Sequence, residues 1–171
     1  MVALRTCMNA RYADWIEDFP QETGWSNFFE DCPGPNFEAI PENHEIDNGT
    51  PIWPGRRGES LQGAPEGAHV GRAFNRIEPD AVRVVVLGQD PYPDIAQATG
   101  RAFEDGRWST EDRPQDLASS LKPLMLAAWA TQQNHSGAFR SGGWPEIVLR
   151  RDFALPDPGT HFDALAEQGV L

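Results

Sequence analysis

The sequence is poor in cysteine and in histidine, and these shortages exclude several kinds of site. Only two cysteines, Cys7 and Cys32, occur among the 171 residues, and they form no CxxC pair. Neither a disulfide framework nor a zinc ribbon is therefore supported. The four histidines are scattered through the chain without the spacing of paired metal ligands. We therefore expect no metal and no cofactor.

Long hydrophobic runs are also missing. No apolar stretch approaches the roughly 20 residues that a membrane-spanning helix needs, and the mean hydropathy is −0.53. The N-terminal segment MVALRTCMNARYADW lacks the sustained apolar centre of a secretory signal. We expect a cytoplasmic protein with no membrane partner, and the composition leaves the oligomeric state open.

Positive charge is scarce as well. The formal net charge is −12 at pH 7, and the 14 basic residues comprise thirteen arginines and the single lysine Lys122. This balance opposes nucleic-acid binding, because affinity for phosphate comes largely from basic side chains that displace counterions. Twelve of the 26 acidic residues lie before residue 70, where only four arginines face them. The rest of the chain is closer to neutral and leaves room for a local basic patch.

We expect residues 1–69 to form a helical and irregular extension. The spacing of Tyr12, Trp15 and Phe19 fits one amphipathic helix, and a second helix could begin at Trp25. Gly and Pro then interrupt the pattern too often for a long helix, so the remainder of this region is expected to be irregular.

Arg56 and Arg57 lie between glycines in the irregular part. Two adjacent guanidinium groups could contact a phosphate, but a solvated turn is the commoner role for such a pair. The sequence favours the solvated turn and leaves the phosphate contact open.

From Val70 onward the pattern is that of an α/β domain. A short helix is expected over residues 70–77. Residues 82–87, VRVVVL, then place Val and Leu in unbroken succession, which is typical of a strand buried on both faces in a parallel sheet. Helical patterns follow at residues 118–129 and 161–167, and residues 169–171 resemble the start of a second buried strand. This order of elements predicts an α/β architecture.

A loop of unusual composition follows the first predicted strand. In an open α/β sheet the ligand site lies beyond the carboxyl ends of the strands, where this chain has GQDPYP, residues 88–93. Pro91 and Pro93 fix their own φ and restrict the residues before them. Asp90 is therefore expected to project from a stiff loop, as a catalytic carboxylate requires. An Asx-turn or a helix cap is the alternative role for Asp90.

Two motifs here resemble those of the family-one uracil-DNA glycosylases. The family pattern is GQDPYH at the end of a strand, followed by GxAF, and this chain has VVVLGQDPYP followed by GRAF at residues 100–103. The resemblance extends over residues 70–171, which we take as the glycosylase-like domain. It implies a three-layer α/β/α fold with a central parallel sheet, incomplete at the C-terminus.

The resemblance implies roles for four residues. Asp90 would orient the attacking water and support the cationic sugar, as carboxylates do in glycoside hydrolysis. Gln89 would line the base pocket, and the ring of Tyr92 would lie where the methyl group of thymine would otherwise sit. Phe103 would stack on the flipped base.

The segment LASSLKPL resembles the phosphate-binding loop of the same family, although alanine replaces its usual prolines. The residues that could hold phosphate are Ser119, Ser120 and Lys122. A helix start capped by one of the two serines is the alternative.

The chain also departs from the family. Pro93 replaces the usual histidine, which removes a polar group near the attacking water. The family strand that carries a uracil-reading asparagine, and a later His-Pro-Ser loop, would lie beyond Leu171. We therefore expect this chain to correspond to the N-terminal part of the family domain and to be nearly inert alone.

The function that the sequence predicts is hydrolysis of the N-glycosidic bond of deoxyuridine in DNA, for base-excision repair. DNA containing uracil would be the partner. A catalytically inactive remnant or binding module of the same fold is the alternative. An unrelated α/β hydrolytic enzyme that uses Asp90 as a nucleophile is a more distant one.

Overall fold

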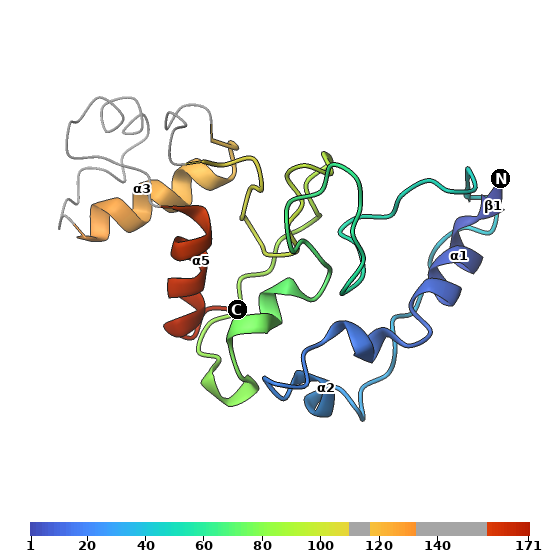
Figure 1. The fold of residues 1–171 in the computed structure, drawn as a ribbon, viewed down its shortest axis with the longest axis horizontal. Coiled ribbons are helices and arrows are strands. Elements are labelled where there is room, and N and C mark those ends of the chain that lie inside the picture. Colours follow the sequence, from blue (N-terminus) through green and yellow to red (C-terminus); the bar gives the residue numbers. More distant parts are fainter. Residues whose placement is uncertain (110–116, 133–156) are drawn as a thin grey trace.

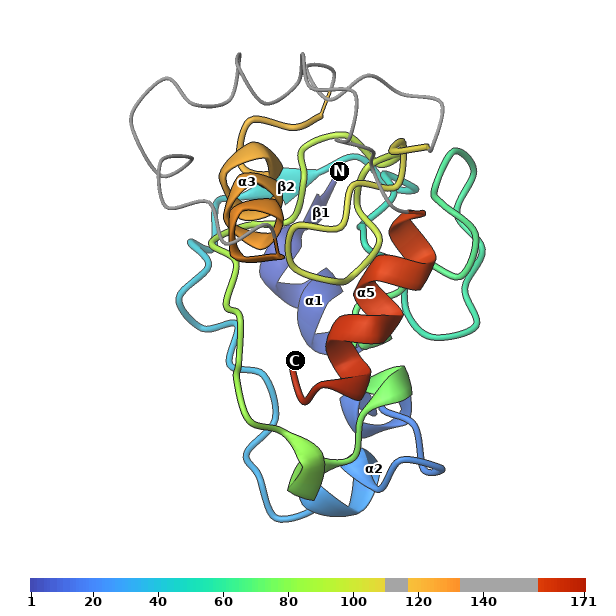
Figure 2. The same cartoon turned by 90° about the vertical axis from the view of Figure 1, so that its left-hand side faces the viewer.

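The computed structural model describes residues 1–109, 117–132 and 157–171. The N-terminal elements lie at one end of an elongated molecule, and two helices lie at the other end (Figure 1). In Figure 2 these two helices, α3 and α5, face the viewer, and the small sheet lies behind them. The elements are β1 (Val2–Ala3), α1 (Leu4–Arg11), η1 (Trp15–Asp18), α2 (Trp25–Phe28), β2 (Glu45–Ile46), η2 (Arg72–Arg76), η3 (Pro79–Ala81), α3 (Leu121–Gln132) and α5 (Pro158–Glu167).

The N-terminal end is organised around a two-stranded antiparallel sheet. β1 pairs with β2, with Val2 opposite Ile46, and α1 follows β1 directly. Arg5, in the first turn of α1, donates hydrogen bonds from its side chain to the carbonyl of Ile40, with one N···O distance of 2.8 Å. The connection between the strands is thereby fixed to the helix.

The amphipathic helix expected around Tyr12 to Phe19 is not a single α-helix. α1 ends at Arg11, and a separate 3-10 turn covers Trp15–Asp18. Asp14, which lies between them, forms an ion pair with Arg56. The spacing of the apolar side chains fits one helix, but the chain breaks into two short helical segments. Asp14 reaches Arg56 from the residues between them.

Aromatic rings connect residues 1–69 to the predicted domain. Phe19 and Trp25 each contact Phe74 of η2, with ring centroids 4.8 and 4.7 Å apart. The indole nitrogen of the buried Trp25 donates a hydrogen bond of 2.6 Å to the carbonyl of Ile77. The expected helix over residues 70–77 is the shorter 3-10 helix η2. These contacts cross residue 69, and the domain boundary there stays a prediction.

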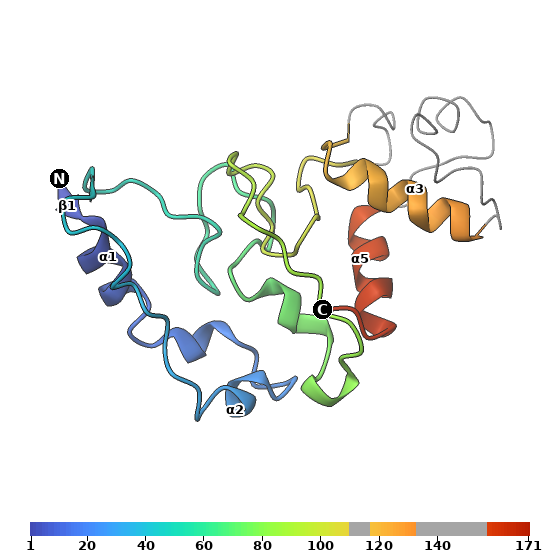
Figure 3. The same cartoon turned by 180° about the vertical axis from the view of Figure 1, so that it is seen from behind.

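The two predicted strands of the α/β domain lie side by side in parallel. Val84 forms a parallel bridge with Val170, and the amide of Leu171 donates to the carbonyl of Val84 at 2.9 Å. Seen from behind, the C-terminus lies beside the segment that follows η3 (Figure 3). The sequence predicted a strand in each segment, and the contact between them is one isolated bridge rather than extended strands.

Residues 82–87, the Val-rich segment, were predicted to be buried on both faces. This prediction is wrong for the described structure. The side chains of Val84, Val85 and Leu87 are 51%, 63% and 89% exposed. The reason is that residues 169–171 are the only backbone partners of residues 84–87 in the described part of the chain. Unbroken apolar composition predicts burial only where neighbours cover both faces.

The two later helices occur close to their predicted positions. α5 begins at Pro158, earlier than expected, because Asp157 caps it by accepting a hydrogen bond of 2.9 Å from the amide of Thr160. α3 begins at Leu121, which is 1% exposed and belongs to a hydrophobic core beside the predicted loop. The core residues are Trp108, Leu117, Leu121 and Met125, with Phe162 of α5 packed against them.

The described residues thus combine helices with a small antiparallel sheet and one parallel bridge. A central parallel sheet between two helical layers is not present among them. Within the described ranges, no helix is both long and apolar enough to cross a membrane.

Candidate functional site

The loop that follows the Val-rich segment exposes its carboxylate. Gln89 and Asp90 are both exposed, and Asp90 has no hydrogen bond or ion pair with any other described residue. The indole nitrogen of Trp53 donates to the carbonyl of Tyr92 at 3.2 Å, which fixes the loop at its far end. The local turn is made by Asp94, whose carboxylate accepts from the amide of Ala96 at 3.0 Å. The alternative role of Asp90 as an Asx-turn or cap residue is therefore wrong.

Tyr92 connects three of the predicted site residues. Its hydroxyl donates to the carbonyl of Phe103 at 3.4 Å and lies 3.3 Å from the hydroxyl of Ser120. Burial raises the pKa of the Tyr92 phenol above its usual range, so this group is a neutral hydrogen-bond donor near pH 7. The structure thus brings Tyr92, Phe103 and Ser120 together.

Phe103 lies in a tight turn formed by residues 98–105. Ala98 and Asp105 form an antiparallel bridge at its base. Gly100 has a φ of +97°, and a β-carbon there would lie 1.8 Å from the carbonyl oxygen of His69, so only glycine fits. Phe103 has a φ of +64° and is the one non-glycine residue of the described chain in this left-handed region.

Phe103 lines a cavity that does not include Asp90. This apolar cavity of about 340 Å³ lies between the Val-rich segment, α3 and α5, and neither Gln89 nor Asp90 lines it. His161 of α5 also lines this cavity, and burial lowers the pKa of its imidazole, so it is neutral near pH 7.

The predicted phosphate-binding residues lie at the start of α3. Ser119 and Ser120 are exposed, and Lys122 is half-buried in the first turn. The carbonyl of Ala118 accepts hydrogen bonds from the amides of Leu121 and Lys122. Neither serine side chain caps the helix within the described residues, because Ser120 contacts Tyr92 instead. The phosphate contact stays a prediction.

Arg56 is neither a solvated turn residue nor free to bind phosphate. Its Nε donates to both carboxylate oxygens of Asp18, at 2.9 and 3.1 Å, and Asp18 is only 2% exposed. The amide of Arg57 donates to the same carboxylate at 2.8 Å. A buried carboxylate needs hydrogen bonds and an opposite charge to offset its loss of hydration. Arg56 supplies the charge and two hydrogen bonds, and the amide of Arg57 supplies another hydrogen bond. Local sequence gave no sign of it.

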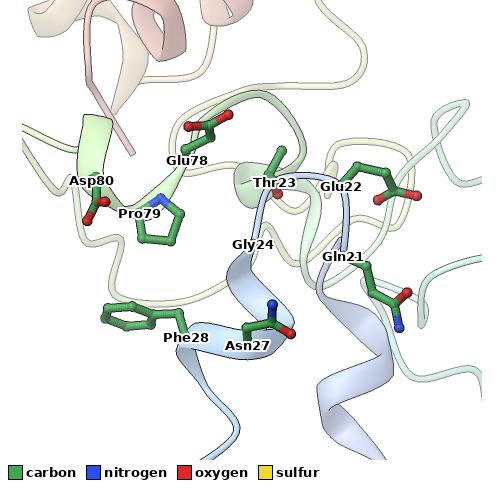
Figure 4. Close-up of a pocket in the computed structure, with 9 residues that line it drawn as sticks. All are labelled: Gln21, Glu22, Thr23, Gly24, Asn27, Phe28, Glu78, Pro79 and Asp80. Atoms are coloured by element: carbon green, nitrogen blue, oxygen red, sulfur yellow. The ribbon is translucent and has the colours of Figure 1, made fainter.

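A second hollow, of about 520 Å³, lies between α2 and η3 and is drawn in Figure 4. None of the predicted site residues lines it, and no group of metal-ligating side chains occurs in the described ranges. Its lining residues are Gln21, Glu22, Thr23, Gly24, Asn27, Phe28, Glu78, Pro79 and Asp80.

Comparison with known proteins gives a name to the resemblance. No family model matches the chain, and no solved structure matches it. A curated uracil-DNA glycosylase from Parafrankia sp. (strain EAN1pec) is 34% identical over an alignment of 124 positions that covers 59% of this chain and 55% of that protein. A curated uracil-DNA glycosylase from Francisella tularensis subsp. holarctica (strain LVS) is 40% identical over 60 residues, which are 35% of this chain and 26% of that protein.

The matched part therefore spans about half of the length of one relative and about a quarter of the other. These similarities support the resemblance that the GQDPY and GRAF segments suggested. The chain is similar to curated uracil-DNA glycosylases over part of their length, which supports a uracil-DNA glycosylase-like family.

Proposed function

We propose that this chain carries the water-activating and base-recognising segments of a uracil-DNA glycosylase, for base-excision repair. The observation that carries the proposal is the contact of Tyr92 with Phe103 and Ser120. Tyr92 belongs to the GQDPY segment, and the chain is similar to curated uracil-DNA glycosylases. The substrate would be deoxyuridine in DNA, flipped out of the base stack.

Asp90 is the proposed catalytic residue. Breaking the N-glycosidic bond leaves positive charge on the sugar and negative charge on the departing uracil, while water supplies the new oxygen at the sugar carbon. A carboxylate beneath the sugar stabilises that cation and orients the water. Asp90 is exposed and has no described partner, so its charge is available to a substrate.

Tyr92 and Phe103 are the proposed base-recognition residues, with Gln89 at the edge of the base. The hydroxyl of the half-buried Tyr92 holds its ring against the turn that carries Phe103. A ring fixed in this way excludes the methyl group of thymine by contact. One methyl group in a fitted pocket is worth about 10-fold to 200-fold in discrimination.

Ser119, Ser120 and Lys122 are the proposed phosphate contacts. All three lie at the start of α3, and Ser120 reaches Tyr92. The side chain of Ser120 would then contact both a DNA phosphate and the hydroxyl of Tyr92. Such contacts position the nucleic acid without reading its sequence.

The fold that we propose for the complete domain is a three-layer α/β/α body around a central parallel sheet. The parallel bridge between Val84 and Val170 supports it. The exposed side chains of Val85 and Leu87 also support it, because further neighbours would bury them.

A binding module without catalysis is the second candidate. It is favoured by the lining of the cavity beside Phe103, which does not include Asp90. Such a protein would bind uracil-containing DNA through Tyr92 and Phe103 and release no base.

A uracil-release assay on a single-stranded oligonucleotide distinguishes the two candidates. It would use the 171-residue chain, and the same chain fused to the unmatched part of the Parafrankia relative. We expect Asp90→Asn to reduce release from the fused chain by at least about 100-fold, a typical cost of losing one charge-stabilising group. The chain alone should be slower, because Asp90 is not among the residues that line the cavity beside Phe103.

Asp31→Asn is the matched control, because it makes the same change at an exposed aspartate outside the site. Release that survives Asp90→Asn would contradict the catalytic role. Binding of the oligonucleotide without any release, by both forms, would favour the binding module.

A further inference from the structure

Glu104 is a buried carboxylate directly after the stacking residue. Its side chain is 3% exposed and lies between two guanidinium groups, 3.3 Å from Nη2 of Arg72 and 3.8 Å from Nη1 of Arg101. Arg101 also pairs with Asp163 of α5 at 2.7 Å. Glu104 is therefore held from η2 on one side and, through Arg101, from α5 on the other.

This anchor lies next to a strained residue. A bulky side chain with a φ near +64° is rare and persists only where its surroundings fix it. The hydroxyl of Thr99 accepts from the amide of Arg101 at 3.2 Å and donates to the carbonyl of Glu104 at 3.5 Å. The two ends of the turn are tied together across Phe103, and the buried side chain of Glu104 fixes one of these ends in the protein.

The strained residue in turn holds Tyr92. The carbonyl of Phe103 accepts the hydroxyl proton of Tyr92. A continuous series of contacts therefore runs from Arg72 and Arg101 through Glu104 and Phe103 to the phenol ring. A change in the conformation of Phe103 would remove the acceptor that locates this ring.

We propose that Glu104, clamped by Arg72 and Arg101, is a positioning residue that sets the location of the Tyr92 ring and with it the discrimination between uracil and thymine. The discrimination rests on the proposed function. The positioning of Tyr92 does not, so the two can be tested separately.

The chain provides its own reporters, because Tyr12 and Tyr92 are its only tyrosines. In protein labelled with ¹³C in the tyrosine rings, two sets of ring signals are expected, and Tyr12→Phe assigns them. Glu104→Ala should move the Tyr92 signals toward those of free tyrosine and leave the Tyr12 signals in place.

Glu104→Gln keeps the size of the side chain and removes its charge. Nη1 of Arg101 makes no hydrogen bond within the described residues, so charge attraction alone holds it to Glu104. Glu104→Gln should therefore move the Tyr92 signals in the same direction by a smaller amount. It also carries the test if Glu104→Ala does not fold. Unchanged Tyr92 signals in a folded Glu104 variant would overturn the proposal.

Asp18→Asn is a matched control with a reciprocal outcome. Asp18 is as buried as Glu104 and is likewise paired with an arginine, Arg56, whose guanidinium carbon lies 5.7 Å from the centre of the Tyr12 ring. Asp18→Asn should move the Tyr12 signals and leave Tyr92 unchanged. If both control and test variants move both tyrosines, general loosening explains the result and the proposal fails.

The discrimination is tested by binding. Fluorescence anisotropy would compare two single-stranded oligonucleotides that differ only in one uracil or thymine. Glu104→Gln should lower the uracil-to-thymine affinity ratio about tenfold, the worth of a poorly fitted methyl group, whereas Asp18→Asn should not change it. An unchanged ratio beside displaced Tyr92 signals would overturn the role in discrimination. No preference in the unsubstituted chain would refute the proposed function, and the ring signals would still decide the positioning.

Discussion

The stability of this protein should fall steeply between neutral pH and pH 4, because of His69. The side chain of His69 is 6% exposed and lies between the N-terminal region and the turn that carries Phe103. Its Nδ1 accepts from the amide of Gly71 at 3.2 Å, and its Nε2 lies 3.0 Å from the side-chain amide of Asn75. Oδ1 of Asn75 has no partner among the described residues. A turn of this amide by 180° would let Oδ1 accept from Nε2–H and satisfy a neutral imidazole.

Burial lowers the pKa of His69 to about 4, and Arg57, Arg72 and Arg101 add to the effect by charge repulsion. The ordinary pKa of 6.5 applies to the unfolded chain, so the unfolded state takes up the proton first as the pH falls. The stabilisation by neutral His69 is therefore complete above pH 6.5. It is lost progressively down to pH 4 and does not change further below that value.

The magnitude follows from this difference in pKa. The shift from 6.5 to about 4 corresponds to about 3 kcal/mol of unfolding free energy. About 2 kcal/mol of it should be lost between pH 7.5 and pH 5. The carboxylates of Asp14 and Glu59 have lowered pKa values and act in the same direction. Their contributions are lost mainly below pH 4, outside this interval.

Urea unfolding at pH 7.5 and pH 5 would measure the effect, with His69→Gln as the test variant. The unsubstituted protein should lose about 2 kcal/mol between the two conditions, and His69→Gln should lose much less. His161→Gln is the control, because His161 also has a lowered pKa but is only half-buried. An equal loss of stability in the unsubstituted protein and in His69→Gln would refute the assignment of a neutral, buried His69.

Two further substitutions test the backbone of the site and the cap of α5. Gly100→Ala should destabilise the protein by at least about 3 kcal/mol, because its β-carbon would collide with the carbonyl of His69 in addition to the strain of positive φ. Gly49 has a similar φ, and no atom beyond its chain neighbours lies within 4 Å of the position that a β-carbon would take, so Gly49→Ala should cost only about 1 kcal/mol. Thermal unfolding would compare the two variants, and equal losses of stability would contradict the proposed collision at Gly100. Asp157→Ala should cost about 1 kcal/mol because it removes the cap of α5, and an unchanged midpoint in the same experiment would show that the helix start does not depend on it.

The sequence predicted the order of the elements better than their environment. The segments around Val84 and Val170 were each predicted as strands, and one parallel bridge joins them. The burial of the Val84 segment was predicted incorrectly, because burial depends on neighbours that no local pattern specifies. The contact of Tyr92 with Phe103 was not predicted, because it depends on how the turn of residues 98–105 packs against the loop of residues 88–93.

The carboxylate clusters could not be predicted for a related reason. Asp18 and Arg56 are 38 residues apart, and Glu104 and Arg72 are 32 residues apart. No periodicity connects such pairs, and an aspartate in a short amphipathic segment is ordinarily exposed. A usable signal would have been the excess of arginine over lysine, because the planar guanidinium is the preferred partner of a buried carboxylate.

This use of arginine limits how the protein can approach DNA. Within the described ranges, every arginine except Arg83 is paired with a carboxylate. The buried pairs of Arg56 and Arg101 cannot be exchanged for phosphate without stranding a carboxylate, whereas an exposed pair such as Arg107 with Asp94 is weak and can be exchanged. Within the described part of the chain, DNA binding would therefore rest on few cations, namely Arg83, Lys122 and the arginines of exposed pairs such as Arg107. Because each neutralised phosphate adds to the salt dependence of binding, that dependence should be shallow despite the anionic ligand, and the base-recognition contacts at Tyr92 would have to supply much of the affinity.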